Sequence, residues 1–508
     1  WPPEVGNCPD YWQVLADGTC ENVKNLGSGC SSPSNFNTSA GMEWNTIGGL
    51  PYRVDSYLGY NAGLIINSGA NNVAIGSAAL SHLTTQTRNV AVGYHALEEC
   101  TNDDNTAVGT QALQDNTTGY YNVGLGYLAG GAIVSANSNT AIGTFALDAD
   151  TLGSKSVAVG TSALTTQNFT TATNTFNVAV GDRAGASVTT GVENTLIGGL
   201  AGDALTDADF NVAFGVAALG SDTKGSKSVA IGNSALLRQN FTTATDSFNV
   251  AVGHDSGSHI TTGIRNTLIG GEAGKALTDA DFNVAVGFQA LLSDQEGSRS
   301  VAVGYNALVL QNKGSAFEMA NVAIGMQAGE NITTGYQNTA VGNEALNSDD
   351  TGRASVAVGF QALKTQNMDA DEEAQNVAVG YQTSYHNVIG RGNTTVGFKA
   401  GAGASGNSHS NLVAIGAKAG QDITTGDSNT FVGASAGENV NSGSYNTLVG
   451  GLSGDAITTG TNDTAVGYAS LSANQTGVNN TAVGSSALAV VTADGNTAIG
   501  HSAGSGIS

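Results

Sequence analysis

The stretch Asn89-Val-Ala-Val-Gly-Tyr-His-Ala-Leu97 is the clearest copy of a nine-residue pattern that fills most of the chain, Asn-[Val/Thr]-Ala-[Val/Ile]-Gly-x-x-Ala-[Leu/Gly]. The fifth-position glycine recurs in 25 copies between Gly76 and Gly500. Of the 24 intervals between these glycines, 17 are 17 residues long, four are 21, two are 16 and one is 19. A period this regular is typical of repeat architectures, in which each unit packs only against its neighbours.

Each copy predicts a short strand followed by a turn. We number its residues 1 to 9, so that Asn89 is at position 1 and Gly93 at position 5. Positions 2 and 4 are mostly β-branched and share one face of a strand, because strand side chains alternate. Position 3 points the other way and is Ala in 19 copies, and position 8 is Ala in 21. We therefore predict that the alanine face lies against another backbone, and that the glycine either turns the chain with φ > 0 or removes a Cβ that would clash.

Substitutions at position 3 suggest which other position it packs against. Where position 3 is Leu, position 6 is Gly; the pairs are Leu196 with Gly199, Leu268 with Gly271, and Leu448 with Gly451. A larger group at one site matched by the smallest at another is typical of volume compensation in a dense interior. Common descent of similar repeats is the alternative explanation.

A four-residue strand with a turn cannot bury enough surface to offset its loss of chain entropy. Stacked units can, because every coil pairs its strand with the coils above and below. We therefore predict an all-β fold, a parallel β-solenoid of about 26 coils with a 17-residue period, which begins with a degenerate coil at 55–63. With roughly 4.8 Å between paired strands, such a solenoid would be on the order of 120 Å long.

The repeats resemble the Asn-Ser-Val-Ala-Ile-Gly repeats of YadA-like trimeric autotransporter adhesin heads and the Asn-Thr-Ala-Val-Gly repeats of viral and phage fibre proteins. The resemblance covers about nine residues of each coil over nearly nine-tenths of the chain. It implies a left-handed parallel β-roll, assembled as an intertwined or side-by-side homotrimer with the repeat strands facing the three-fold axis. Adhesin heads usually have a shorter period than the repeats of this chain. In a trimer, the alanine face would contact the sister subunits.

Composition limits the range of functions. The formal net charge is −24 in 508 residues, which argues against binding nucleic acid through its phosphates. No run of 18 apolar residues and no signal peptide are present in the sequence as given. It begins at Trp1 rather than Met, which suggests that an upstream segment has been removed.

The four cysteines predict disulfides rather than a metal site. Cys8, Cys20 and Cys30 cluster near the N-terminus with a spacing that fits no zinc motif. We predict a disulfide-bonded N-terminal knot formed in an extracellular setting, whose remaining cysteine pairs with Cys100 or with another chain.

Residues 1–54 lack the repeat and form a separate N-terminal segment, whereas 55–508 form the solenoid. The stretch from Trp1-Pro-Pro-Glu to Cys8-Pro-Asp-Tyr-Trp12 resembles a segment of structural proteins of large DNA viruses of algae and amoebae. This resemblance implies an anchor to a capsid, a membrane or another surface; a disulfide-stapled cap is the alternative.

At the C-terminal end, no polar cap follows the coil at 496–504, so we expect the native polypeptide to continue or another protein to cover this coil.

The four 21-residue coils are the irregular features of the repeat. Three coils of 17 residues and one of 21 make a 72-residue unit that occurs twice, at 156–227 and 228–299. Insertions in solenoids go to outer loops, so we predict that the Gln-Asn pair of each long coil projects and contacts a host receptor or glycan. Passive bulges are the alternative. The candidate contacts are Gln167, Asn168, Gln239, Asn240, Gln311, Asn312, Gln366 and Asn367.

No arrangement of residues predicts catalysis. His254-Asp255-Ser256 names the residue types of a hydrolase triad, but adjacent residues on one strand cannot adopt its geometry. Two Asp-x-Asp pairs could supply oxygen ligands to Ca²⁺, with solvated turns as the alternative; they are Asp207 with Asp209, and Asp279 with Asp281.

We therefore predict no enzyme. The leading hypothesis is a structural fibre or adhesin-like protein on a virion or cell surface, a rigid trimer that presents its loops for attachment. A soluble carbohydrate- or ice-binding protein is the alternative, although Thr at position 2 alternates with Val and Ser, which counts against ice binding. A polysaccharide-degrading β-helix enzyme would need clustered carboxylates, and the acidic residues are dispersed.

Overall fold

The computed structural model describes residues 55–65, 68–368, 372–406 and 408–505, and the backbone of two short strands before them. These two, β1 (Gln13–Val14) and β2 (Cys20–Glu21), pair antiparallel. The chain divides into two compact units, Trp1–Asp209 and Phe210–Ser508. The predicted N-terminal anchor otherwise lies outside the described residues.

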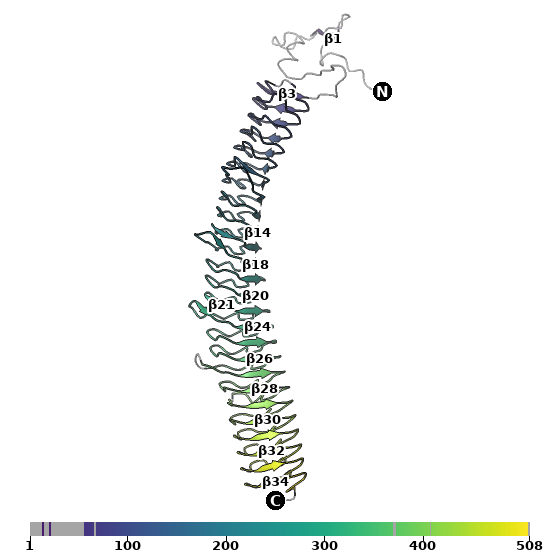
Figure 1. The fold of residues 1–508 in the computed structure, drawn as a ribbon, viewed down its shortest axis with the longest axis vertical. Coiled ribbons are helices and arrows are strands. Elements are labelled where there is room, and N and C mark those ends of the chain that lie inside the picture. Colours follow the sequence, from purple (N-terminus) through teal and green to yellow (C-terminus); the bar gives the residue numbers. More distant parts are fainter. Residues whose placement is uncertain are drawn as a thin grey trace, which may run out of the picture. The chain divides into compact units, whose positions relative to one another are not determined.

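Both units are built from three-residue strands, one in each coil, which stack on one another (Figure 1). In the first unit these strands are β3 (Ser56–Leu58), β4 (Val73–Ile75), β5 (Val90–Val92), β6 (Thr106–Val108), β7 (Val123–Leu125), β8 (Thr140–Ile142), β10 (Val157–Val159), β12 (Val178–Val180) and β13 (Thr195–Ile197). In the second they are β14 (Val212–Phe214), β16 (Val229–Ile231), β18 (Val250–Val252), β19 (Thr267–Ile269), β20 (Val284–Val286), β22 (Val301–Val303), β24 (Val322–Ile324), β25 (Thr339–Val341), β26 (Val356–Val358), β27 (Val377–Val379), β28 (Thr394–Val396), β29 (Val413–Ile415), β30 (Thr430–Val432), β31 (Thr447–Val449), β32 (Thr464–Val466), β33 (Thr481–Val483) and β34 (Thr497–Ile499).

Neighbouring strands are parallel and in register, so that each repeat position stacks on the same position of the next coil. Val301 pairs with Val322 and Ala302 with Ala323, although one of the long coils separates them. Nine coils lie in the first unit and 17 in the second, and no helix occurs among the described residues. The predicted parallel β-solenoid of about 26 coils is therefore confirmed.

The glycine at position 5 is required by both backbone conformation and space. Gly287 has φ +134°, a region that residues with a Cβ rarely adopt, and a Cβ there would lie 2.5 Å from the carbonyl oxygen of Gly304. Gly304 stands in the same relation to Gly325, at 2.4 Å. The glycine column thus leaves no room for a side chain between consecutive coils.

Position 1 holds the coils together through a ladder of buried asparagines. The Asn122 side chain donates from Nδ2 to the carbonyl of Ala136 at 2.8 Å, across its own coil. Its Oδ1 accepts the backbone N–H of Asn139 in the next coil at 3.0 Å. Its own N–H donates to Oδ1 of Asn105 in the preceding coil, also at 3.0 Å. A side chain that both closes a coil and links it to the next satisfies backbone groups that no strand partner reaches.

The alanine face lies inside each coil, so the predicted contact of this face with sister subunits is wrong. The position 3 alanines, such as Ala158 and Ala302, are completely buried within their own chain, and so are Ala163 and Ala307 at position 8. A Cβ added at Gly124, which takes position 3 in one coil, would lie 2.8 Å from the Ala129 carbonyl oxygen of the same coil. The backbone that approaches position 3 so closely is therefore the opposite wall of the narrow coil.

Position 3 is compensated by position 9, not by position 6 as predicted. A Cβ on Gly185 or Gly202, at position 9 of successive coils, would lie 2.8 or 2.7 Å from the side chain of Leu196. By contrast, a Cβ on Gly199, at position 6, would meet nothing closer than 4.0 Å. A large side chain at position 3 therefore fills the space that leucine occupies at position 9 elsewhere.

Position 12 follows the same volume rule. Most coils with Gly at position 9 place a buried aliphatic side chain three residues later, the exception among the described residues being Gly401 with the exposed Ala404; the buried side chains are Ile133, Val188, Leu205, Ile260, Leu277, Ile332, Ile423, Val440 and Ile457. Most coils with Leu at position 9 carry a buried polar side chain or cysteine there instead, Leu83 and Val491 being exceptions. A glycine at position 9 thus usually leaves space that an aliphatic side chain at position 12 helps to fill, as Leu205 does beside Gly202.

Asp463 replaces asparagine at position 1 in one coil and remains in the ladder. Its Oδ1 accepts the backbone N–H of Asn480 at 2.8 Å, whereas the Nδ2 of Asn480 is buried without a partner. Burial raises the pKa of Asp463 to about 6. The folded state therefore binds this proton more tightly than the unfolded chain does. The contribution of Asp463 to stability is complete below about pH 4 and is lost as the pH rises through 6.

We therefore expect Asp463→Asn to raise the free energy of unfolding at pH 7 by roughly 1–3 kcal/mol and to change it much less at pH 4. Urea titrations of both proteins at the two pH values measure the difference. Asp279→Asn is the matched control, because the Asp279 side chain is exposed. An equal effect of Asp463→Asn at both pH values would contradict the role assigned to this carboxyl group.

Candidate functional site

The glutamines of the 21-residue coils do not project, contrary to prediction. Gln167, Gln239, Gln311 and Gln366 are all completely buried. The asparagines that follow them reach the surface: Asn168, Asn240 and Asn367 are exposed, and Asn312 is partly exposed. Only the asparagines of the predicted pairs are thus placed where an external partner could contact them.

Each buried glutamine repairs a gap in the asparagine ladder. In the 21-residue coils position 1 is serine rather than asparagine. Gln239 donates from Nε2 to Ser228 Oγ at 3.0 Å and to Asp222 Oδ2 at 2.5 Å, and its Oε1 accepts from Asn249 Nδ2 at 2.8 Å. The other long coils repeat this arrangement around Gln167, Gln311 and Gln366. The glutamine amide thus occupies the place of the shorter asparagine amide.

The long coils project through the segments after their Gln-Asn pairs. These segments run beside the preceding coil in two-stranded parallel sheets: β9 (Gly153–Ser154) with β11 (Thr173–Asn174), β15 (Gly225–Ser226) with β17 (Thr245–Asp246), and β21 (Gly297–Ser298) with β23 (Phe317–Glu318). The residues at their tips, 170–172 and 242–244, are exposed. These tips and the preceding asparagines are the projecting part of the long coils.

The predicted calcium ligands mostly serve the coils themselves. Asp209 Oδ1 accepts the backbone N–H of Val192, and Asp281 Oδ1 accepts that of Ile264, both at 2.8 Å. Asp207 and Asp279 accept from the preceding threonine hydroxyls. Among the described residues, no three His, Cys, Asp or Glu side chains gather as they would around a metal ion.

Cys100 carries a free thiol and is completely buried, which contradicts the alternative in which it pairs with the remaining N-terminal cysteine. It occupies position 12 of its coil, where burial raises the pKa of the thiol to about 11. The side chains of Cys8, Cys20 and Cys30 lie outside the described residues.

In the stretch that resembles a triad, the buried Ser256 hydroxyl donates to the Leu268 carbonyl at 2.9 Å, so it is not directed at His254.

The outward strand face, made of positions 2 and 4, is apolar and partly exposed; position 6 beside it is aromatic in some coils and polar in others, as at Asn233 and His254. In the second unit, every residue at positions 2 and 4 is Val, Thr, Ile or Phe. Aromatic rings at position 6 stack along it: Tyr381 lies 5.2 Å from Phe360 and 5.3 Å from Phe398 between ring centroids, with the rings nearly parallel. Exposed apolar surfaces of this extent typically mark interaction sites.

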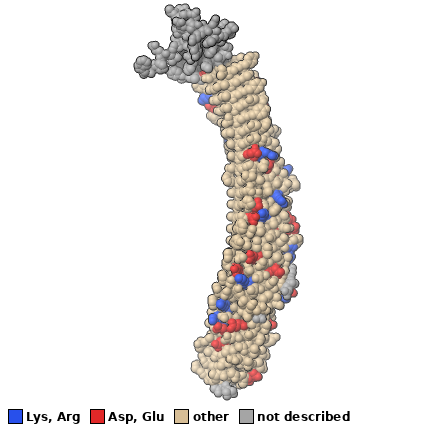
Figure 2. Space-filling model, turned by 180° about the vertical axis from the view of Figure 1, so that it is seen from behind, with Lys and Arg blue, Asp and Glu red and all other residues tan. Residues whose placement is uncertain are grey.

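Positions 7 and 10 run beside this face and are polar in most coils, with exceptions such as Leu237 and Val309; we call them the polar edge. Its groups pair from coil to coil: Lys418 lies 3.0 Å from Glu438, and Gln361 donates to Glu344 at 2.8 Å. On the side of the molecule drawn in Figure 2, positive and negative side chains are interspersed rather than segregated. Paired exposed charges of this kind contribute little stability but hold neighbouring side chains in place.

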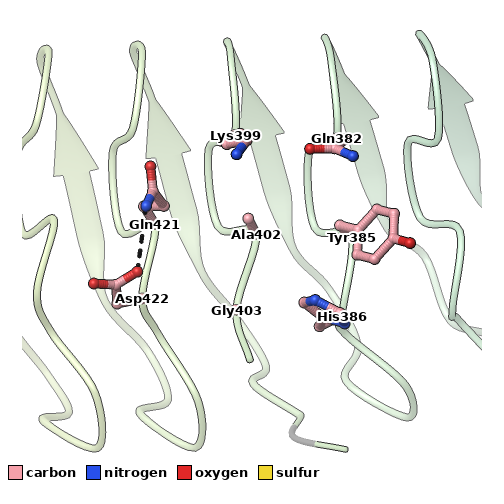
Figure 3. Close-up of a pocket in the computed structure, with 8 residues that line it drawn as sticks. All are labelled: Gln382, Tyr385, His386, Lys399, Ala402, Gly403, Gln421 and Asp422. Carbon is pink, nitrogen blue, oxygen red and sulfur yellow. Dashed lines mark hydrogen bonds between the residues drawn. The ribbon is translucent and has the colours of Figure 1, made fainter. Parts of the chain in front are cut away.

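The polar edge is interrupted after β28, where position 10 is Ala402 and position 11 is Gly403. A hollow of about 330 Å³ opens there across three coils (Figure 3). Tyr385 and His386 lie on the preceding coil, Gln421 and Asp422 lie on the following coil, and Lys399 and Gln382 line the side nearer the strands. This coil differs in length from every other coil of the repeat, and that difference was the sequence signal that should have singled it out.

Comparison with known proteins identifies no family. No family model matches the sequence, and no curated protein matches it. Within the part of the chain that the structure describes, no helix is long and apolar enough to cross a lipid bilayer.

A pair of variants tests whether the buried glutamines stabilise the fold. We expect Gln239→Ala to lower the free energy of unfolding by about 1–3 kcal/mol, because Asp222 and Asn249 lose a buried partner. Asn240→Ala, at the adjacent exposed position, should change it by no more than about 0.5 kcal/mol. Thermal or urea unfolding of the two variants measures both. Equal stabilities would contradict the role assigned to the Gln239 side chain.

Proposed function

We propose that this chain is a structural fibre or adhesin-like surface protein that assembles as a homotrimer through its outward strand face. One observation carries the proposal: positions 2 and 4 form a continuous face without a charged side chain within each unit. Solvent-facing β-branched and aromatic side chains on every coil are costly to leave in water. A second and a third copy of the same periodic face would cover them with matching spacing.

The interface of such a trimer would be formed by the outward strand face and not by the alanine face. The buried alanines are unavailable to a partner, whereas Ile324, Phe288 and Tyr305 are 40%, 50% and 49% exposed. The resemblance to trimeric adhesin heads and viral fibres places the strands toward a three-fold axis. The residues facing that axis would be Val, Thr, Ile and aromatic side chains, and not alanines.

The remaining surfaces fit the other parts of the proposal. The turns and the tips of the long coils would point away from the axis and present Asn168, Asn240 and their following threonines to a receptor or glycan. The N-terminal segment would attach the fibre to a virion, a cell or another surface. A formal charge of −24 on each chain would keep such a fibre soluble and free of nucleic acid.

Native mass measurement tests the assembly. We expect a species of three times the 50.8 kDa chain mass. The double variant Phe288→Glu with Tyr305→Glu should dissociate into monomers while its circular dichroism stays unchanged, because it places charges in the proposed interface. Thr262→Glu with Thr425→Glu, at exposed turns, is the matched control and should remain trimeric. A monomeric native protein, or a double variant that remains trimeric, would overturn the proposal.

A further inference from the structure

The hollow beside β28 lies where a rung of the polar edge, meaning a long side chain at position 10, is missing. In the adjoining coils position 10 carries a long side chain, Tyr385 before the gap and Gln421 after it, whereas the intervening coil has only Ala402. The coils remain in register beside the hollow: the backbone N–H of His386 donates to the Ala402 carbonyl, and the backbone N–H of Gly403 donates to the Gln421 carbonyl, both at 2.8 Å. The hollow is therefore a built feature of an ordered backbone.

The missing rung leaves polar groups without partners. Lys399 forms no ion pair within the described chain, and its ammonium lies over the Phe398 ring, 5.6 Å from the centroid. The exposed Asp422 carboxylate receives a long 3.4 Å contact from Gln421 Nε2, and Gln421 Oε1 is buried without a hydrogen bond among the described residues. A buried unpaired acceptor such as Gln421 Oε1 is costly unless another molecule satisfies it, whereas Lys399 and Asp422 are open to solvent and to a ligand.

A buried histidine lies behind the hollow. His409 is only 1% exposed, and its Nε2 has no hydrogen-bond partner among the residues that the structure describes. Its Cε1 would lie 3.8 Å from a Cβ on Gly403, which lines the hollow. Burial lowers the pKa of His409 to about 4, so its imidazole is neutral at pH 7. It is a further polar group for which the chain itself supplies no partner.

A second hollow on the same edge shows the contrast. It has a volume of about 500 Å³ and is lined by Glu272 and Lys275. There the charges are already paired, because Lys275 lies 2.9 Å from Glu272 and 3.0 Å from Asp255. The hollow beside β28 is thus distinguished by its unpaired groups, not by its size.

The charge and hydrogen-bonding groups of the lining indicate which class of ligand the hollow would bind. Lys399 and Asp422 contribute opposite charges, and partial burial lowers the pKa of His386, so the lining has no net charge at pH 7. The lining offers both donors and acceptors, and the Tyr385 ring forms an apolar wall whose hydroxyl points away from Ala402 (Figure 3). A volume of about 330 Å³ is at the small end of ligand sites, roughly 300–1,000 Å³.

We propose that the hollow formed by Tyr385, His386, Lys399, Ala402, Gln421 and Asp422 binds one neutral sugar ring of a glycan. Vicinal hydroxyls would donate to Asp422 and to Gln421 Oε1, and Lys399 would donate to a sugar oxygen. The inference rests on the proposed attachment function and names its ligand class. It places the glycan contact on the polar edge rather than at the Gln-Asn pairs.

The test restores the missing rung. Ala402→Gln introduces the side chain that the next coil carries at this position, so it should fill the hollow without disturbing the fold. Titration of the full chain with galactose, mannose and N-acetylglucosamine, followed by saturation-transfer NMR, should show binding of at least one of them. We expect Ala402→Gln to lower this affinity at least tenfold. Ala489→Gln, at position 10 of another coil, is the matched control and should bind as the unmodified chain does.

Four outcomes would overturn the inference: no binding of any neutral sugar, binding only of sialic acid or sulfate, unchanged affinity in Ala402→Gln, or equal loss in both variants. Native mass, measured on the same samples, separates this result from the assembly proposal. A trimer that binds no sugar would remove the site alone. A monomer that binds sugar through the hollow would remove the trimer alone.

Discussion

The asparagine ladder is the interaction on which the rest of the fold depends. Each coil contributes a strand of only three residues, and backbone hydrogen bonds between coils continue through the turns. The side chain at position 1 adds one bond within its own coil and one to the next coil: Asn122 Nδ2 donates to the Ala136 carbonyl, and Asn122 Oδ1 accepts the backbone N–H of Asn139. The backbone N–H of Asn122 in turn donates to Asn105 Oδ1 of the preceding coil. Because this ladder is buried, each missing contact costs the desolvation of a polar group. Where serine or aspartate interrupts it, the structure supplies Gln239, or Asp463 itself, as a replacement.

The narrow cross-section follows from the ladder and the glycine column. Position 3 lies so close to the opposite wall that only alanine fits beneath a leucine at position 9, and larger groups need glycine there, as around Leu196. The interior is therefore complete within one chain. The surface that remains uncovered is the outward strand face with its aromatic stacks. This division explains why the same repeat carries small residues inward and β-branched residues outward.

The solenoid, its period and its number of coils could be predicted from the glycine spacing alone, because Gly287 and its equivalents meet a backbone constraint that no other residue satisfies. The sequence could not show whether the alanine face points into the coil or outward. Alternation separates the two faces of a strand but does not say which one is interior. The burial of Gln239 could not be predicted either, because an insertion usually forms an outer loop. Here the Gln239 side chain points inward and bonds to Ser228, the serine that replaces asparagine at position 1. The hollow beside β28 depends on which side chains meet across three coils, and one sequence does not give these contacts.

The most direct measurement of the central claim is the distance between equivalent positions of distant coils. Spin labels at Val301→Cys and Val377→Cys, in a chain whose native cysteines are replaced by serine and which is diluted with unlabelled chain, can be measured by pulsed electron resonance. These positions are separated by four in-register strand pairings, although they lie far apart along the sequence. Coils stacked in register predict one narrow distribution near roughly 19 Å, four steps of about 4.8 Å. A broad distribution, or one centred well beyond about 30 Å, would contradict the account.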